Sequence, residues 1–237
     1  MPTPGAPSAD IHIPPFAKTP YAPFSRMAAV QIAYREWRAF GQRVVLSPDQ
    51  PESADSAERD EGLWQRVGEY WWLGLDYGNS DGRWTGKHDQ NGTEFPRSQD
   101  GEFAWSAAFI DYVMRMSGAG RYFPYSASHS DYINAAASRQ LGIALTAMPL
   151  TQYPPQLGDL VCMWRANRPI TFQDLPTPSH FPGHCDIVVA RYPNSLDVIG
   201  GNVDNAVVMK HVPTGPSGLV TDRDYPWFVV LRVAYQR

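Results

Sequence analysis

The stretch GEFAWSAAFIDYVMRMSG, residues 101–118, decides the fold because it combines a buried helix with a polar side chain at its start. Apolar side chains recur at the spacing of one helix face packed on a core, and they are Trp105, Phe109, Tyr112, Val113 and Met116. Ser106 stands in the first turn, where backbone N–H groups are unpaired and the potential is positive. This position suits a nucleophile, and it equally suits a serine that only caps the helix.

Helical and strand periodicities divide the rest of the chain. We expect further helices over residues 25–46, which begins at the N-cap Ser25, and over 58–76 and 128–140. After residue 157 the period changes to two, with short β-branched or aromatic runs separated by Pro, Gly and Asn turns; the runs are GDLVCMWR, HCDIVVAR, LDVIGGN, AVVMKHV and WFVVLRVAY. The order predicts an α+β fold, with N-terminal helices packed on a small antiparallel sheet.

Three regions follow from this reading. Residues 1–24 are Pro-rich and aperiodic, and we interpret them as a flexible tether. Residues 25–57 hold the first helix and a linker rich in Pro, Ser and acids, which we expect to separate that helix from the main domain of residues 58–237. The segment 78–100 is rich in Gly, Asp, Asn and Pro, and it predicts a long functional surface loop.

Composition limits the partners. The 237-residue chain has a formal net charge of -4, so there is no basic footprint for nucleic acid or an anionic membrane surface. No apolar run approaches the length needed to span a bilayer, and residues 1–24 lack the charged and apolar regions of a signal peptide, so we expect no transmembrane segment in this sequence. The tether resembles the segment that follows a removed export or lipoprotein signal, which predicts the periplasm or cell envelope, with any lipid anchor lost with that signal. A cytosolic protein with a flexible N-terminus would show the same pattern. The sequence does not give the oligomeric state.

Two cysteines, Cys162 and Cys185, lie in separate predicted strands. A cross-strand disulfide and two buried free thiols fit the sequence equally well. A zinc site could use His180, His184 and Cys185 with Asp186 or His129. Helical ligand geometry is excluded because Pro182 and Gly183 intervene, so we expect no metal. The phosphate-binding and dinucleotide-binding glycine motifs are also missing, and we expect no cofactor.

A run of motifs carries a resemblance over residues 60–235. They are WQRVGEYWWLGL, WTGKHD, AWSAAFIDYVMR, FPYSASHSDYI, PQLGDLVC, FPGHCDIVVA, VIGGNVDNAV and YPWFVVLRV. In this order they resemble the bacterial family called domain of unknown function 2272, and more broadly the NlpC-type and CHAP-type papain-like hydrolases. The resemblance implies a papain-like domain with Ser106 at the nucleophile position, His184 as general base and Asn202 orienting His184.

The serine is a departure from those relatives, which carry a cysteine there. A thiol ionises readily beside a histidine, whereas a hydroxyl must lose its proton during attack and therefore needs an accurately placed base. We expect a further set of side chains to contact substrate, although core packing, capping or turn formation would also explain each one. They are Asp186, Trp84, Trp105, Tyr125, His129 and Asp204. Asp186 and Asp204 are also rival partners for His184.

The resemblance implies an amide hydrolase of the bacterial cell envelope that acts on peptidoglycan or a related peptide. Two other functions fit the same sequence. One is a binding module that retained the cleft and lost turnover, and the other is a secreted antibacterial effector. Muropeptide binding without turnover would distinguish the first alternative, and toxicity on periplasmic expression would distinguish the second.

Overall fold

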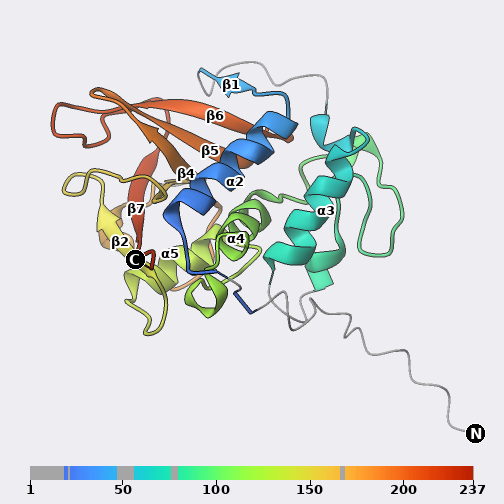
Figure 1. The fold of residues 1–237 in the computed structure, drawn as a ribbon, viewed down its shortest axis with the longest axis horizontal. Coiled ribbons are helices and arrows are strands. Elements are labelled where there is room, and N and C mark those ends of the chain that lie inside the picture. Colours follow the sequence, from blue (N-terminus) through green and yellow to red (C-terminus); the bar gives the residue numbers. More distant parts are fainter. Residues whose placement is uncertain (1–18, 21, 47–55, 76–79, 166–168, 237) are drawn as a thin grey trace, which may run out of the picture.

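The computed structural model describes residues 19–20, 22–46, 56–75, 80–165 and 169–236. This part of the chain contains four α-helices and one seven-stranded sheet, which confirms the α+β class. Figure 1 shows the sheet on one side of the molecule, α2 (Arg26–Ala39) and α4 (Ser106–Met116) next to it, and α3 (Leu63–Gly74) on the far side of α4. The predicted tether, residues 1–24, and the loop after the first helix lie largely outside the described residues.

The sheet is larger than predicted and it is mixed. Its strand order is β1-β6-β5-β4-β3-β7-β2, with bounds β1 Val44–Val45, β2 Leu145–Pro149, β3 Leu160–Trp164, β4 Gly183–Arg191, β5 Ser195–Val203, β6 Ala206–Pro213 and β7 Trp227–Val233. All the pairs are antiparallel except β1 with β6, which is parallel. The expected small antiparallel sheet is therefore corrected to a mixed sheet that gains one short strand at each edge.

The first helix ends earlier than the apolar periodicity indicated. α2 spans Arg26–Ala39, and the Ser25 side chain accepts a hydrogen bond from the amide of Ala28 as its cap. Gly41 and Gln42 then take positive φ values of 80° and 60°, a conformation that a right-handed helix does not continue through. The prediction that Val44 belongs to the helix face was wrong, because Val44 pairs with Met209 in the sheet.

The other three helices agree with the sequence to within a few residues. They are α3 Leu63–Gly74, α4 Ser106–Met116 and α5 His129–Ala137. α4 is the central helix, since ten of its eleven residues are buried and it packs against α3 on one side and against β4 and β5 on the other. The helix that begins at Ser106 therefore lies in the middle of the fold.

A buried ion-pair cluster attaches α2 to the rest of the domain. The carboxylate of Glu36, with no exposed surface, accepts hydrogen bonds from Arg66 at 2.6 Å and from the hydroxyl of Tyr70 at 2.7 Å. Burial alone would raise the pKa of Glu36, but these hydrogen bonds outweigh it and the pKa is lowered. α2 therefore shares the core of the main domain.

A disulfide links the centre of the sheet. Cys162 of β3 and Cys185 of β4 are directly opposite in the strand register and are joined through their sulfur atoms. Of the two readings that the sequence left open, the structure has the bridge. Among the described residues no helix combines the length and the apolar character needed to cross a bilayer.

Candidate functional site

Ser106 does not cap its helix. The N-cap of α4 is Trp105, and Ser106 is the first residue with helical geometry. Its hydroxyl oxygen lies 2.8 Å from Nε2 of His129, in a hydrogen bond between two buried side chains. The hydroxyl therefore bonds an imidazole, where a capping serine would accept a bond from a backbone amide of its own helix.

His129 is the first residue of α5, and its second ring nitrogen is also engaged. Nδ1 forms a hydrogen bond with the phenol of Tyr132, which lies three residues later on the same helix face. Burial lowers the pKa of His129 well below its ordinary value, and the nearby His184 and Arg165 lower it further. The imidazole is consequently neutral at physiological pH, with one nitrogen protonated and the other free to accept.

A second buried chain lies on the sheet and begins at His184. Nε2 of His184 is 2.7 Å from one carboxylate oxygen of Asp186, and Nζ of Lys210 is 2.7 Å from the other. All three side chains are at most 1% exposed. Burial alone would raise the pKa of Asp186, but Lys210 and His184 outweigh it and hold this pKa well below the usual range. Asp186 is therefore a carboxylate.

The ionised Asp186 fixes the tautomer of His184, because a carboxylate accepts and its partner nitrogen must carry the hydrogen. Nδ1 of His184 then has a lone pair, and this buried atom has no partner among the described residues. Burial lowers the pKa of His184 to about 4, against the opposing effect of Asp186. His184 is thus a neutral imidazole with one unused acceptor.

The two chains meet at their histidines. The ring centroids of His129 and His184 are 5.3 Å apart, with a tilt of 53° between the ring planes. Ser106 keeps 5% of its surface exposed and His129 keeps 4%, whereas His184 and Asp186 keep none. The Ser106 and His129 pair is therefore the outer part of the site, and His184, Asp186 and Lys210 form its inner support.

Two glycines of β5 make this arrangement compatible with the sheet. A Cβ atom on Gly200 would lie 1.7 Å from Asp186 Oδ1 and 2.8 Å from His184 Nε2. A Cβ atom on Gly201 would lie 2.5 Å from the Cβ of Phe109 on α4. The GGN motif therefore lets the strand pass between the carboxylate and the helix, which is a steric reason for both glycines.

The hydrogen-bond partners differ from those that the resemblance implied. The partner of Ser106 is His129, which the sequence placed only among substrate contacts, while His184 bonds Asp186. Asn202 follows the glycines with φ of 52°, and its side chain makes no hydrogen bond within the described part of the chain. Asp204 pairs with Arg43.

The expected aromatic contacts are mainly packing contacts. Trp105 is 1% exposed and packs on Phe40 and Tyr70. Trp84 stacks on Phe103 with ring centroids 3.7 Å apart, so it anchors its loop. Tyr125 is half-buried, and the guanidinium of Arg115 lies over its ring.

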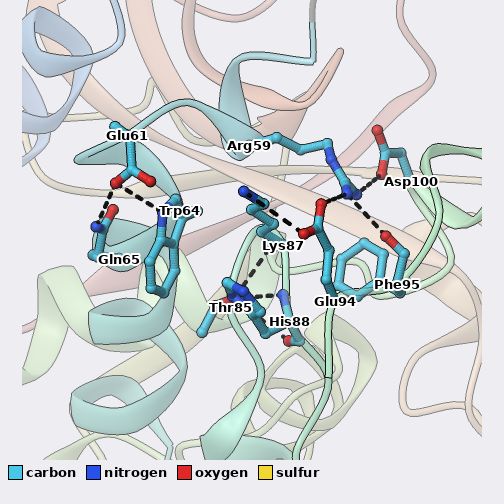
Figure 2. A network of polar contacts seen from close by, with 10 residues as sticks. All are labelled: Arg59, Glu61, Trp64, Gln65, Thr85, Lys87, His88, Glu94, Phe95 and Asp100. Atoms are coloured by element: carbon cyan, nitrogen blue, oxygen red, sulfur yellow. Dashed lines mark hydrogen bonds and ion pairs between the residues drawn. The ribbon is translucent and has the colours of Figure 1, made fainter. Parts of the chain in front are cut away.

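A buried carboxyl connects the site to the loop of residues 85–100. Glu58 accepts a hydrogen bond from the indole N–H of Trp105, the residue before Ser106. Burial raises the pKa of Glu58 to about 7 against the opposing effect of that hydrogen bond. Next to it, the guanidinium of Arg59 binds Asp100 at 2.7 Å, and Glu94 at 2.9 Å (Figure 2). The loop is therefore held in place directly beside the segment that supports Ser106.

A hollow of about 540 Å³ lies along that loop and is separate from the serine. Its lining residues are Arg59, Lys87, Glu94, Phe95, Pro96 and Arg97, several of which appear in Figure 2. Ser106, His129 and His184 are not among the residues that line this hollow. Across the described ranges no three His, Cys, Asp or Glu side chains are grouped to hold a metal ion, and His180 pairs with Asp131 at 3.0 Å.

Three residues were missed from sequence, two in the hydrogen-bonded chains and one, Glu58, beside them. Tyr132 had a detectable signal, since it lies three positions after His129 on a predicted helix and such residues share a face. Lys210 also had one, because it is an ionisable residue within the apolar run AVVMKHV. Glu58 had no signal, because its contact with Trp105 spans 47 residues.

The comparisons with known proteins identify a family and no function. The family model described as an uncharacterized protein conserved in bacteria, DUF2272, matches residues 58–233. No curated protein and no solved structure matches the chain significantly.

Proposed function

Because the chain belongs to this bacterial family, DUF2272, whose description assigns no activity, we propose a function from the site itself: a hydrolase that cleaves an amide bond through the hydroxyl of Ser106. The single observation that carries the proposal is the 2.8 Å hydrogen bond between Ser106 and His129. A nucleophile, a base within hydrogen-bond reach and a third group that orients the base are the parts that acyl transfer requires. Here the third group is the phenol of Tyr132.

The proton arrangement that serves this reaction is specific. His129 Nδ1–H donates to the oxygen of Tyr132, and the lone pair of Nε2 accepts the Ser106 hydrogen. Burial holds the pKa of Tyr132 well above its usual value, so the phenol stays neutral. Because the pKa of His129 is lowered, the imidazole is unprotonated at Nε2 before the reaction.

The chemical steps follow from this geometry. Ser106 Oγ attacks the carbonyl carbon while its proton moves to Nε2 of His129, which gives a tetrahedral intermediate and an imidazolium. The imidazolium then gives that proton to the leaving nitrogen as the C–N bond breaks, and an acyl ester remains on Ser106. His129 takes a proton from the attacking water and gives it to Ser106 Oγ as the C–O bond of the ester breaks, which releases the carboxylic acid and restores the serine hydroxyl.

The start of α4 supplies stabilisation for the oxyanion. The backbone N–H groups of the first helical turn have no partner within the helix and face its positive end. Donors aimed at a developing oxyanion typically contribute about 3–4 kcal/mol each. The position of Ser106 as the first helical residue therefore suits both attack and anion stabilisation.

The substrate class in the proposal is a peptide amide of the bacterial cell wall. This part rests on the resemblance to NlpC-type and CHAP-type hydrolases. The disulfide between Cys162 and Cys185 supports an exported protein, because disulfides persist in oxidising compartments such as the periplasm.

Digestion of purified peptidoglycan tests the proposal. Wild type, Ser106→Ala and Ser106→Cys are incubated with it under equal conditions, and mass spectrometry identifies the soluble muropeptides. We expect new products with wild type and none with Ser106→Ala. Cleavage by Ser106→Cys alone would indicate a binding module that lost turnover. Equal products from wild type and Ser106→Ala would contradict the proposal.

A further inference from the structure

The inner chain of the site holds a cation that the proposed reaction does not use. Lys210 lies on β6, and its side chain is 1% exposed. A buried ammonium is costly unless it is paired. Its hydrogen-bond partner is the Asp186 carboxylate at 2.7 Å, and the Tyr225 ring lies 5.7 Å from Nζ. The buried ammonium is therefore paired with the Asp186 carboxylate, and any effect of its charge on the site should act through that carboxylate.

The two oxygens of Asp186 have different occupants. Oδ1 accepts from His184 and Oδ2 accepts from Lys210. Oδ1 occupies the space that a Cβ atom of residue 200 would fill, since such an atom would lie 1.7 Å from it, so the carboxylate lies directly against the backbone of Gly200. The lysine and the glycine together fix the direction of the Asp186 oxygen that faces the imidazole.

We propose that Lys210 is a positioning residue of the Ser106 site, which acts through Asp186 to hold His184 neutral and in the Nε2–H tautomer. The order follows from the bonds, because Asp186 bonds both His184 and Lys210, and among the described residues no hydrogen bond joins His184 to Lys210 directly. The consequence is that Nδ1 of His184 keeps its lone pair and can accept a hydrogen bond. This buried atom has no partner within the described residues. Its role in hydrolysis rests on the function proposed above, whereas its effect on His184 does not.

The direction of the effect follows from the surrounding charges. The groups that face His184 are Asp186 on the same strand, Lys210 on β6, Arg165 after β3 and His129 on α5. Burial, Arg165 and Lys210 lower the pKa of His184, and Asp186 raises it. Without the lysine charge, the Asp186 carboxylate would be uncompensated and would favour the imidazolium. The protonated ring would then have no acceptor at Nδ1.

The test measures His184 by nitrogen-15 NMR in wild type, Lys210→Met and Lys210→Arg, with Lys87→Met as the surface-lysine control. We expect the Nε2–H tautomer in wild type. In Lys210→Met the titration of His184 should shift upward by about one pH unit or more, a tenfold change in proton affinity. Lys210→Arg should restore the wild-type titration, and Lys87→Met should leave it unchanged. If Lys210→Met does not fold, Lys210→Gln, which keeps a hydrogen-bond donor without the charge, takes its place.

The proposal would be overturned if His184 in Lys210→Met had the same titration midpoint and the same tautomer as in wild type. The hydrolysis assay is read separately. With activity present, the acid limb of the pH profile of kcat should shift upward in Lys210→Met with KM little changed. A shift in the NMR titration without any hydrolysis by wild type would overturn only the proposed function.

Discussion

The imidazole of His129 lies between two groups, with Nε2 2.8 Å from the hydroxyl of Ser106 and Nδ1 bonded to the phenol of Tyr132. Both neighbours come from helices, Ser106 from α4 and Tyr132 from α5 itself. The second histidine, His184, stands behind this group on the sheet, with its ring centroid 5.3 Å from that of His129. The site therefore has an outer pair, Ser106 and His129, and an inner chain on the sheet that begins at His184.

Replacement of His129 should abolish most of the hydrolysis. We expect His129→Ala to lower kcat by about 10²- to 10⁴-fold, the usual contribution of a general base, because among the described residues no other imidazole is bonded to Ser106. The measurement is the rate of muropeptide release. His211→Ala is the matched control, since that histidine is 52% exposed and pairs with Asp197. Retention of the wild-type rate by His129→Ala would assign the base to another group.

Gly200→Ala should disturb the inner chain by steric conflict. The new methyl group would overlap Asp186 and His184, and overpacking of this kind costs about 1–3 kcal/mol. Thermal unfolding should show a lower Tm, and His184 should lose its wild-type NMR signals. At Gly82 the nearest atom to a Cβ lies 3.6 Å away, so Gly82→Ala is the control that should change little. A wild-type Tm for Gly200→Ala would show that the strand moves away without cost.

The stability of the protein should carry a pH dependence from Glu58. Burial raises its folded pKa from 4.5 to about 7, so between these values the folded state binds more protons than the unfolded state. Stability from this group is present below pH 4.5 and is lost as the pH rises towards 7. The loss is on the order of 3 kcal/mol.

The free energy of unfolding is measured in urea at pH 5 and pH 7.5, for wild type and for two variants. Glu58→Gln keeps an acceptor for Trp105 and should show a smaller fall in the free energy of unfolding than wild type. Glu61→Gln, a nearby exposed change, should behave as wild type. Equal falls for wild type and Glu58→Gln would mean that the carboxyl titrates normally in the folded state.

The disulfide should contribute to stability through the unfolded chain. It joins residues 23 positions apart, and a closed loop of this size corresponds to about 3 kcal/mol in the chain-entropy description. The double variant Cys162→Ala/Cys185→Ala should lose about that amount in urea unfolding, and wild type should lose it on reduction. Insensitivity of wild type to reductant would contradict this expectation.

The sequence predicted most elements whose signals are local. The helices that hold Ser106 and His129 and the five later strands follow from periodicity, capping and turn residues. The short edge strands were missed because Val44–Val45 and Leu145–Pro149 have no clear alternation of their own, and they are set by pairing with β6 and β7. Edge pairing is a tertiary effect that a local pattern does not contain.

Four side chains of the candidate site were named from sequence, but their hydrogen bonds were not, and Tyr132 and Lys210 were missed. Ser106, His129, His184 and Asp186 were all named from sequence, but the spacing along the chain did not indicate that Ser106 would bond His129, 23 residues away, and not His184. The packing of α5 beside the start of α4 decides that. The partner of His184 was assigned to Asn202, whereas the strand alternation already placed Asp186 on the same face.

The most direct test of the account asks whether Ser106 is an activated nucleophile, independently of substrate. The protein is treated with a fluorophosphonate, which reacts with activated serine hydroxyls, and intact mass and peptide mapping locate the adduct. The account predicts one adduct on Ser106 in wild type, much slower labelling in His129→Ala and no adduct in Ser106→Ala. A folded wild-type protein that stays unlabelled, or labelling at the same rate in His129→Ala, would contradict it.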